Sequence, residues 1–191
     1  MTSVFIRNFT FAALPASGLN GQPLFHGLLA KCDFDVNEYR DELFAVYGIA
    51  FPGSLQKAVA KRRAEYLAGR FVARQVLNML EVRDYPLANG LDRAPLWPAG
   101  LIGSISHNNQ RALCTAQIIT PAIEHSDESG YVHGVGLDIE SLIAVERAND
   151  LWPGILSEEE YRNLQEGPLA FNHLLTLAFS AKESLFKAVY P

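Results

Sequence analysis

The fold of this chain is decided by residues 55–82, LQKAVAKRRAEYLAGRFVARQVLNMLEV. Apolar side chains recur there every three or four positions, and they form one stripe: Leu67, Phe71, Val72, Val76 and Leu80. This period is typical of an amphipathic helix that buries one face. Ser54 stands just before the stretch and is the predicted N-cap. The sequence therefore predicts one long helix as the central packing element.

The other faces of this helix are basic, although the chain as a whole is acidic. Arg63, Arg70 and Arg74 are separated by seven and four positions, and Arg62 and Arg70 by eight, so several guanidinium groups can share one side. The chain has 16 Lys plus Arg against 21 Asp plus Glu, a net charge of −5. This excess of acid argues against a general nucleic-acid binder, so any basic site must be local.

An antiparallel hairpin is expected downstream of the helix. LIGSISH, residues 101–107, alternates like a strand, Asn108-Asn109 turns the chain, and RALCTAQII, residues 111–119, returns. A polar loop then leads to YVHGVGLDIE, residues 131–140, a predicted third strand. Residues 1–53 alternate apolar runs with turn signals, which indicates strands, loops and a short helix. The fold class is therefore α+β.

Two further helices are expected toward the C-terminus. Ser157 with Glu160 forms a capping-box signature, and Gly167-Pro168 ends the short acidic helix that it opens. The last stretch, from Leu169 on, carries apolar residues at helical spacing and predicts a strongly amphipathic or buried helix.

Two pairs of charged residues are candidates for chemistry. Asp138 and Glu140 are two apart on a predicted strand, so both carboxylates face the same side and offer the oxygen ligands that Mg²⁺ prefers. Most such pairs are solvated strand ends. Glu183 and Lys187 are four apart on the last helix; as a surface ion pair they would contribute only about 0.3–0.5 kcal/mol. Their apolar neighbours make a wholly exposed position less common.

Other sequence signals bear on a ligand site and on the compartment. Ser106 and His107 offer a hydroxyl and an imidazole at the end of a strand, and no Ser-His-Asp triad can be ordered around them. Cys32 and Cys114 form no C-x-x-C pair and fit reduced thiols. No run is long enough to span a membrane and no secretory signal is recognisable, so a cytoplasmic protein is expected.

Five motifs follow one another between Lys61 and Ala188: KRRAEYLAGR, RAPLWP, GSISHN, GVGLDIE and FSAKESLFKA. In this order they resemble the surfactin-type 4′-phosphopantetheinyl transferases, most closely their enterobactin-synthase (siderophore) branch. The resemblance implies two similar subdomains related by a pseudo-twofold axis, with coenzyme A in the cleft between them. We expect these subdomains at residues 1–125 and 126–191. Family members continue with further strands after the K-E-S helix, so the second subdomain is expected to be incomplete at Pro191.

The resemblance also implies roles for individual residues. Asp138, Glu140 and Glu183 would bind Mg²⁺, and Lys187 would contact the phosphates. Ser106 and His107 would meet the adenosine 3′-phosphate. Further nucleotide contacts are expected from basic residues, with Arg63 as an alternative to the first of them: Arg62, Arg70 and Arg93.

The implied reaction transfers the 4′-phosphopantetheine group of coenzyme A to a serine of an apo peptidyl, aryl or acyl carrier protein and releases adenosine 3′,5′-bisphosphate. Glu183, directly or through a metal-bound water, is the candidate general base, and Lys187 would neutralise the departing phosphate. A monomer is expected. Three alternatives remain: a Mg²⁺-dependent phosphohydrolase, a non-catalytic module that binds coenzyme A or a carrier, and an unrelated α+β domain.

Overall fold

The computed structural model describes residues 4–17, 23–119 and 134–189, and it confirms the α+β class. The strands are β1 (Ile6–Ser17), β2 (Pro23–Phe34), β3 (Leu101–His107) and β4 (Arg111–Ile118). The helices are α1 (Leu43–Val46), α2 (Ala60–Met79), α4 (Val145–Leu151), α5 (Glu158–Gln165) and α6 (Phe171–Val189). Single 3₁₀ turns lie at Val36–Glu38, Gly53–Leu55 and Trp152–Gly154.

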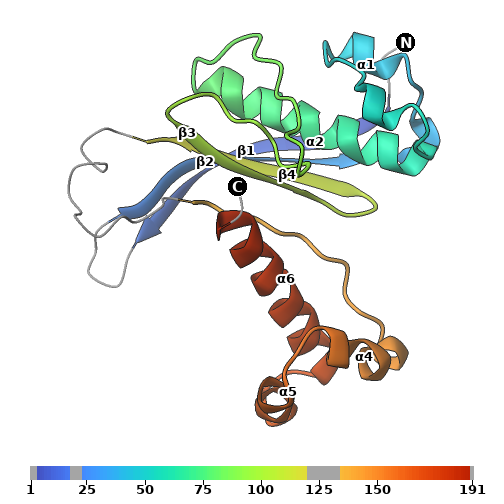
Figure 1. Cartoon of the computed structure of the whole chain (residues 1–191), viewed down its shortest axis with the longest axis vertical. Coiled ribbons are helices and arrows are strands. Elements are labelled where there is room, and N and C mark those ends of the chain that lie inside the picture. The colour runs from blue at the N-terminus through green and yellow to red at the C-terminus, as the bar shows by residue number, and fades with distance from the viewer. Residues whose placement is uncertain (1–3, 18–22, 120–133, 190–191) are drawn as a thin grey trace.

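The four strands form one antiparallel sheet in the order β1-β2-β4-β3 (Figure 1). The predicted hairpin is confirmed, because β3 pairs with β4 from Leu101↔Ile118 to His107↔Ala112. Asn108 makes its turn: its side-chain oxygen accepts from the backbone N–H groups of Gln110 and Arg111 at 3.0 and 2.9 Å. A short polar side chain thus replaces backbone partners at the tip. β3 lies at an edge of the sheet.

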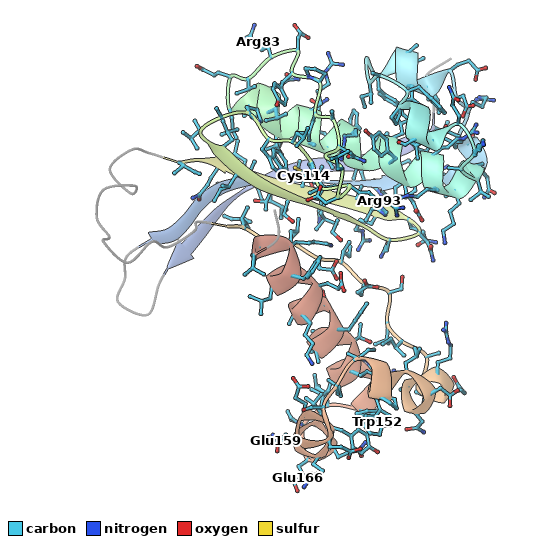
Figure 2. The ribbon with its side chains drawn as sticks, in the orientation of Figure 1. Arg83, Arg93, Cys114, Trp152, Glu159 and Glu166 are labelled. Carbon is cyan, nitrogen blue, oxygen red and sulfur yellow. The ribbon has the colours of Figure 1, made fainter. Side chains whose placement is uncertain are left out.

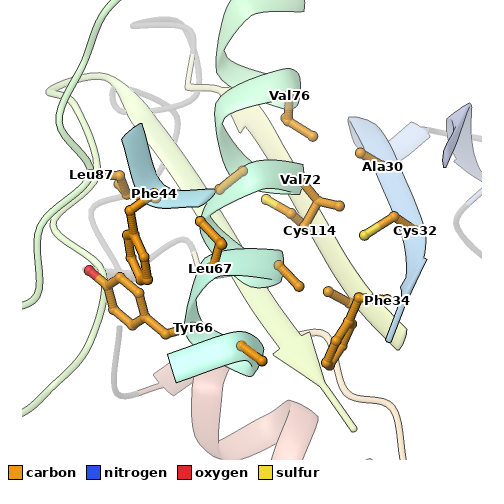
Figure 3. Packing of buried hydrophobic residues seen from close by; sticks show 14 of the residues in the cluster. Ala30, Cys32, Phe34, Phe44, Tyr66, Leu67, Val72, Val76, Leu87 and Cys114 are labelled. Carbon is orange, nitrogen blue, oxygen red and sulfur yellow. The ribbon is translucent and has the colours of Figure 1, made fainter. Parts of the chain in front are cut away.

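Helix α2 covers one face of this sheet and buries the main core against it (Figures 1 and 3). Leu67, Val72 and Val76 of the predicted stripe are fully buried, whereas Phe71 and Leu80 are half-buried at its margins. Opposite them lie small side chains of β2 and β4: Ala30, Cys32, Ala112, Cys114 and Ala116. Small residues let the helix approach the sheet closely, and this close packing fixes the position of α2 relative to the sheet.

The predicted start of the helix is wrong. Ser54 is not an N-cap but part of a 3₁₀ turn, and Val59 occupies the N-cap position with extended backbone and no side-chain cap. Arg63 explains the break, because its guanidinium donates to the carbonyl oxygens of Leu55 and Gln56 at 3.0 and 2.6 Å. The carbonyl of Leu55 also accepts from the N–H of Ala58 at 2.9 Å, so the side chain of Arg63 supports a tight turn that precedes the helix.

Both cysteines are buried free thiols on neighbouring strands. Burial raises the pKa of Cys32 to about 12 and that of Cys114 further in the same direction. Such thiols stay protonated and unreactive at neutral pH.

Residues 134–140 differ from the predicted strand, whose first three residues lie outside the described part of the chain. The segment has no regular backbone pairing. Instead, the N–H groups of Leu137 and Ile139 donate to the hydroxyls of Ser104 and Ser106 on β3 at 3.0 and 3.2 Å. Alternate residues of the segment still bond to β3, as in a strand, but they bond to serine hydroxyls instead of backbone carbonyls.

A second, smaller core holds the three C-terminal helices together, with Ala148, Leu156 and Leu175 buried at its centre. The ring of Trp152 stacks on that of Tyr161 with centroids 4.0 Å apart. The predicted capping box at the start of α5 and the predicted last helix are confirmed. Helix α4 was not predicted. α6 reaches from α4 and α5 to the underside of the sheet (Figure 1). No helix in the described ranges is both long and apolar enough for a bilayer.

Gly136 should be intolerant of any side chain. A Cβ atom there would lie 1.6 Å from the carbonyl oxygen of Ser184, which is backbone of α6 and cannot rotate away. We expect Gly136→Ala to lower the free energy of unfolding by on the order of 1–3 kcal/mol, measured by urea denaturation.

Gly154→Ala is the matched control for this substitution, since nothing lies within 4 Å of its added Cβ. Equal stability of the two variants would show that residues 134–140 are not held against α6.

Candidate functional site

Asp138 is the centre of the contacts between the two parts of the molecule. Its side chain is 3% exposed, and its Oδ1 atom accepts from Ser106 Oγ at 2.9 Å and from Lys187 Nζ at 2.6 Å. Lys187 Nζ also donates to Ser106 Oγ at 3.1 Å and to the carbonyl of Leu137 at 3.2 Å. Strand β3, the 134–140 segment and α6 therefore meet at one carboxylate oxygen.

The other oxygen of this carboxylate has no hydrogen-bond partner at the usual distance in the described part of the chain, although the hydroxyl of Ser180 also helps to lower the pKa of the group. Oδ2 of Asp138 is buried and accepts no hydrogen bond from the described residues. Burial by itself would raise the pKa of Asp138, but the hydrogen bonds from Lys187 and Ser106 outweigh it and the pKa lies below its ordinary value. The group is thus a charged carboxylate with one unused lone-pair face, which is the state that a cation requires.

Glu140 is electrostatically coupled to both Asp138 and Glu183. The pKa of Glu140 is raised first by burial, then by repulsion from Asp138, with a smaller contribution from Glu183. The D-x-E pair and the acid of α6 therefore lie on the same side of the molecule. No three acidic, histidine or cysteine side chains in the described ranges are close enough to hold an ion as they stand. The donor set fits Mg²⁺ by charge and ligand type.

A cavity of about 390 Å³ adjoins this acidic cluster. Its wall includes the following candidate nucleotide ligands together with the lysine of α6: Arg62, Arg70, Arg93, His107 and Lys187. Its volume falls in the range of small-molecule sites. Arg93 has a positive φ of 73° and lies beside the sheet (Figure 2). The structure thus brings cationic groups from α2, a loop and α6, together with an imidazole from β3, to one cavity.

Arg70 is fixed in the wall of this cavity. It is 8% exposed, its Nε donates to the carbonyl of Leu87 at 2.9 Å, and its guanidinium also binds Asn89. The guanidinium carbon lies 4.5 Å from the centre of the Tyr66 ring, a cation–π contact. These contacts leave part of the guanidinium facing the cavity in a set orientation.

Two residues of the predicted site, Ser106 and Arg63, do not line this cavity. Ser106 is buried, and its hydroxyl is used by Asp138, Lys187 and Ile139 rather than lining the cavity. Arg63 is turned away, with NH1 donating to Asp41 at 2.7 Å, so Arg62 is the one of the adjacent pair that lines the cavity.

Arg74 lies on a different side of α2 from Arg62. Its NH1 donates to the carbonyls of Tyr47 and Gly48, both at 2.7 Å, beside a second cavity of about 490 Å³. Among the predicted site residues, only Arg70 lines both cavities.

Sequence reasoning missed three residues at the site. Trp97 lines the cavity, and its ring lies so close to Gly103 that a Cβ there would be 2.5 Å from it. Ser104 holds the 134–140 segment, and the Ser-x-Ser spacing on a predicted strand could have indicated it. Glu65 lines the cavity with a side chain only 13% exposed, and nothing in the pattern of a basic helix singled it out.

Comparisons with known proteins bear on this site. A family model described as 4′-phosphopantetheinyl transferase N-terminal domain matches residues 51–117, and one described as 4′-phosphopantetheinyl transferase superfamily matches residues 134–191. The chain is 38% identical over 156 residues to enterobactin synthase component D of Salmonella typhimurium, covering 82% of this chain and 59% of the relative.

Two further relatives extend this picture. Enterobactin synthase component D of Escherichia coli K12 is 39% identical over 134 residues, covering 70% of this chain and 58% of the relative. The 4′-phosphopantetheinyl transferase PptT of Mycobacterium tuberculosis is 29% identical over 137 residues, covering 72% and 55%. The chain thus spans somewhat more than half the length of the curated relatives that it matches.

His107 should make the protein less stable as the pH falls. Burial, followed by repulsion from Arg62 and Lys187, lowers its pKa to about 4. The unfolded chain therefore binds a proton near pH 6.5, before the native state does, so stability declines from about pH 6.5 to about pH 4, by about 3 kcal/mol at most. An NMR titration of the ring measures the midpoint directly, and in urea denaturation His107→Gln should lose less stability between pH 7 and pH 5 than wild type. A midpoint at 6.5 or above would contradict this account.

Proposed function

Because the chain belongs to the 4′-phosphopantetheinyl transferase superfamily, in its enterobactin-synthase branch, we propose that it transfers 4′-phosphopantetheine from coenzyme A to a serine of an apo carrier protein. One observation carries the proposal: Lys187 lines the basic cavity and also binds Asp138 in the acidic cluster. A pyrophosphate that bridges the two regions would have cations on its oxygens and carboxylates beside its reacting bond.

The cavity is suited to the nucleotide end of coenzyme A. The guanidinium groups of Arg62, Arg70 and Arg93 bind phosphate oxygens in a forked geometry, and the imidazole of His107 lies among them. Ser106, which the resemblance gives to the 3′-phosphate, would act here by holding Asp138 and Lys187 in place. Its direct contact with a phosphate stays a prediction.

The reaction needs positioning and charge neutralisation more than covalent help. The serine oxygen forms a bond to the β-phosphorus, and the bond from that phosphorus to the bridging oxygen breaks, which releases adenosine 3′,5′-bisphosphate. Glu183 takes the serine proton, directly or through a water. The positive charge of Lys187 offsets the charge that develops on the leaving phosphate.

Mg²⁺ held by Asp138, Glu140 and Glu183 would supply neutralisation of charge on the pyrophosphate. The buried Oδ2 atom of Asp138 and the pKa of Glu140, which Asp138 and Glu183 help to raise, support this assignment.

Two packed units, the sheet with α2 and the helices α4 to α6 with their own core, support a division of the chain into two parts. The proposed boundary at residues 125 and 126 lies outside the described residues. The pseudo-twofold relation of the two units stays a prediction. Buried free thiols agree with a reducing compartment, and we place the protein in the cytoplasm as a monomer.

Transfer is tested by incubating the protein with coenzyme A, Mg²⁺ and an apo carrier protein and weighing the carrier by mass spectrometry. A gain of one phosphopantetheine is expected. Asp138→Asn and Glu183→Gln keep the shape but remove a carboxylate charge, so each should slow transfer at least about 100-fold. Phosphate release without a carrier would favour the alternative function of a phosphohydrolase. Binding of coenzyme A without formation of any product would favour the non-catalytic module.

Glu159→Gln is the matched control, since Glu159 lies on α5 at the far end from the sheet (Figure 2). Wild-type rates in the Asp138 or Glu183 variant would remove the carboxylates from the mechanism.

The carrier is proposed to dock on the basic surface next to the cavity. Lys57 and Lys61 are exposed there, at and before the first turn of α2. Charge complementarity to an acidic carrier acts mainly on association, so Lys57→Glu with Lys61→Glu should raise the KM for the carrier and leave the KM for coenzyme A unchanged. An unchanged KM for the carrier would place docking elsewhere.

A further inference from the structure

We propose that Glu65 is a positioning residue, whose carboxylate sets the ring of His107 and, through that ring, the guanidinium of Arg62 at the phosphate-binding end of the cavity. The inference rests on the proposed function for its ligand, but its geometry concerns the protein alone. Glu65 is the acid of the K-R-R-A-E segment at the start of α2.

The three side chains form a closed triangle in the cavity wall. Oε2 of Glu65 lies 3.9 Å from NH1 of Arg62 and 3.9 Å from Nδ1 of His107. The third side is the hydrogen bond between NH1 of Arg62 and Nε2 of His107, at 3.2 Å. All three residues line the cavity of about 390 Å³.

The hydrogen bond defines the tautomer of the ring. A guanidinium has only donors, so Nε2 of His107 must be the acceptor in its contact with Arg62. The neutral ring then carries its proton on Nδ1, the atom that faces Glu65. The ring of His107 also has a hydrogen bond to its own backbone. The carboxylate of Glu65, 3.9 Å away, is a second and longer contact that favours the same tautomer and also faces the guanidinium that the ring binds.

The alternative role for Glu65 is an ion pair with Lys61 on the surface of the helix, but this pair does not explain why the carboxylate is largely buried. Glu65 also lies 3.9 Å from Lys61 Nζ one turn earlier, and exposed pairs of this kind stabilise a helix only slightly. However, the carboxylate is 13% exposed, whereas the Lys61 side chain is 55% exposed. The groups that act electrostatically on His107 from α2 and α6 are the cations Arg62, Arg70 and Lys187. The negative charge of Glu65 would repel an anion in this cavity. Its presence there is favourable only if it also orders the cations that bind the anion.

Ordering of this kind favours ligand binding by preorganisation. Arg62 is half exposed, and a free side chain of this length would lose rotamer freedom when a phosphate fixes it. With His107 and Glu65 holding it, much of that loss occurs on folding instead. An incoming phosphate then replaces His107 as the acceptor for a guanidinium that already points into the cavity.

The wild-type protein provides the first test, without any variant or ligand. Long-range ¹H–¹⁵N NMR of the His107 ring near pH 7 should show the proton on Nδ1 and a bare Nε2. A ring protonated at Nε2 overturns the proposal.

Two substitutions of Glu65 provide the second test. Glu65→Met removes charge and acceptors, and it should mix the two tautomers and weaken the binding of 3′,5′-ADP about tenfold in calorimetry. Glu65→Gln keeps an acceptor oxygen and should fall between Met and wild type. In the transfer assay both should raise the KM for coenzyme A and leave kcat within about twofold. Glu159→Gln controls for the lost negative charge.

The outcomes separate this proposal from the proposed function. If wild type binds 3′,5′-ADP and transfers phosphopantetheine but Glu65→Met does so equally well, Glu65 has no positioning role and the function stands. If wild type binds no 3′,5′-ADP while the ring tautomer depends on Glu65, the triangle is upheld and the assigned ligand is wrong.

Discussion

The ion pair between Lys187 and Asp138 is the interaction on which the arrangement of the site depends. The carboxylate is almost fully buried, and the ammonium of Lys187 lies 2.6 Å away. A buried carboxylate without a cation is strongly unfavourable, so α6 must place its lysine here for the 134–140 segment to lie under the sheet. The two parts of the molecule, each with a core of its own, are held together through this charge more than through shared apolar area.

The segment next to this ion pair obtains its hydrogen bonds from side chains rather than from a neighbouring strand. The 134–140 segment lies against β3 on one side and α6 on the other. Serine hydroxyls of β3 accept from the N–H groups of Leu137 and Ile139. Just beyond the segment, Asn172 and Thr176 of α6 bind the carbonyl and the N–H of Ile143. Buried hydroxyls and an amide thus satisfy backbone groups that no sheet partner reaches.

The sequence predicted the elements whose causes are local. The apolar stripe of α2, the turn at Asn108 and the capping box at Ser157 depend on residues within a few positions of one another, and all three are present. The failures depend on distant partners. Ser54 was expected to cap a helix because nothing local shows that Arg63 would bind the carbonyls beyond it, and the unpaired 134–140 segment requires hydroxyls from another strand.

Acidic and basic side chains are largely separated in the molecule, which explains how an acidic chain can contain the proposed anion site. Its acids are concentrated away from the cavity, as in the first turn of α5, and Glu159 and Glu166 lie at the far end of the molecule from the sheet (Figure 2). Inside the cavity the balance is reversed, and the cations that surround His107 add to the effect of burial in keeping its ring neutral. A phosphate entering there would offset the repulsion among those cations. The cavity is therefore electrostatically incomplete without an anion, while the carboxylates beside Lys187 are incomplete without a further cation, and a metal-bound pyrophosphate would supply both charges.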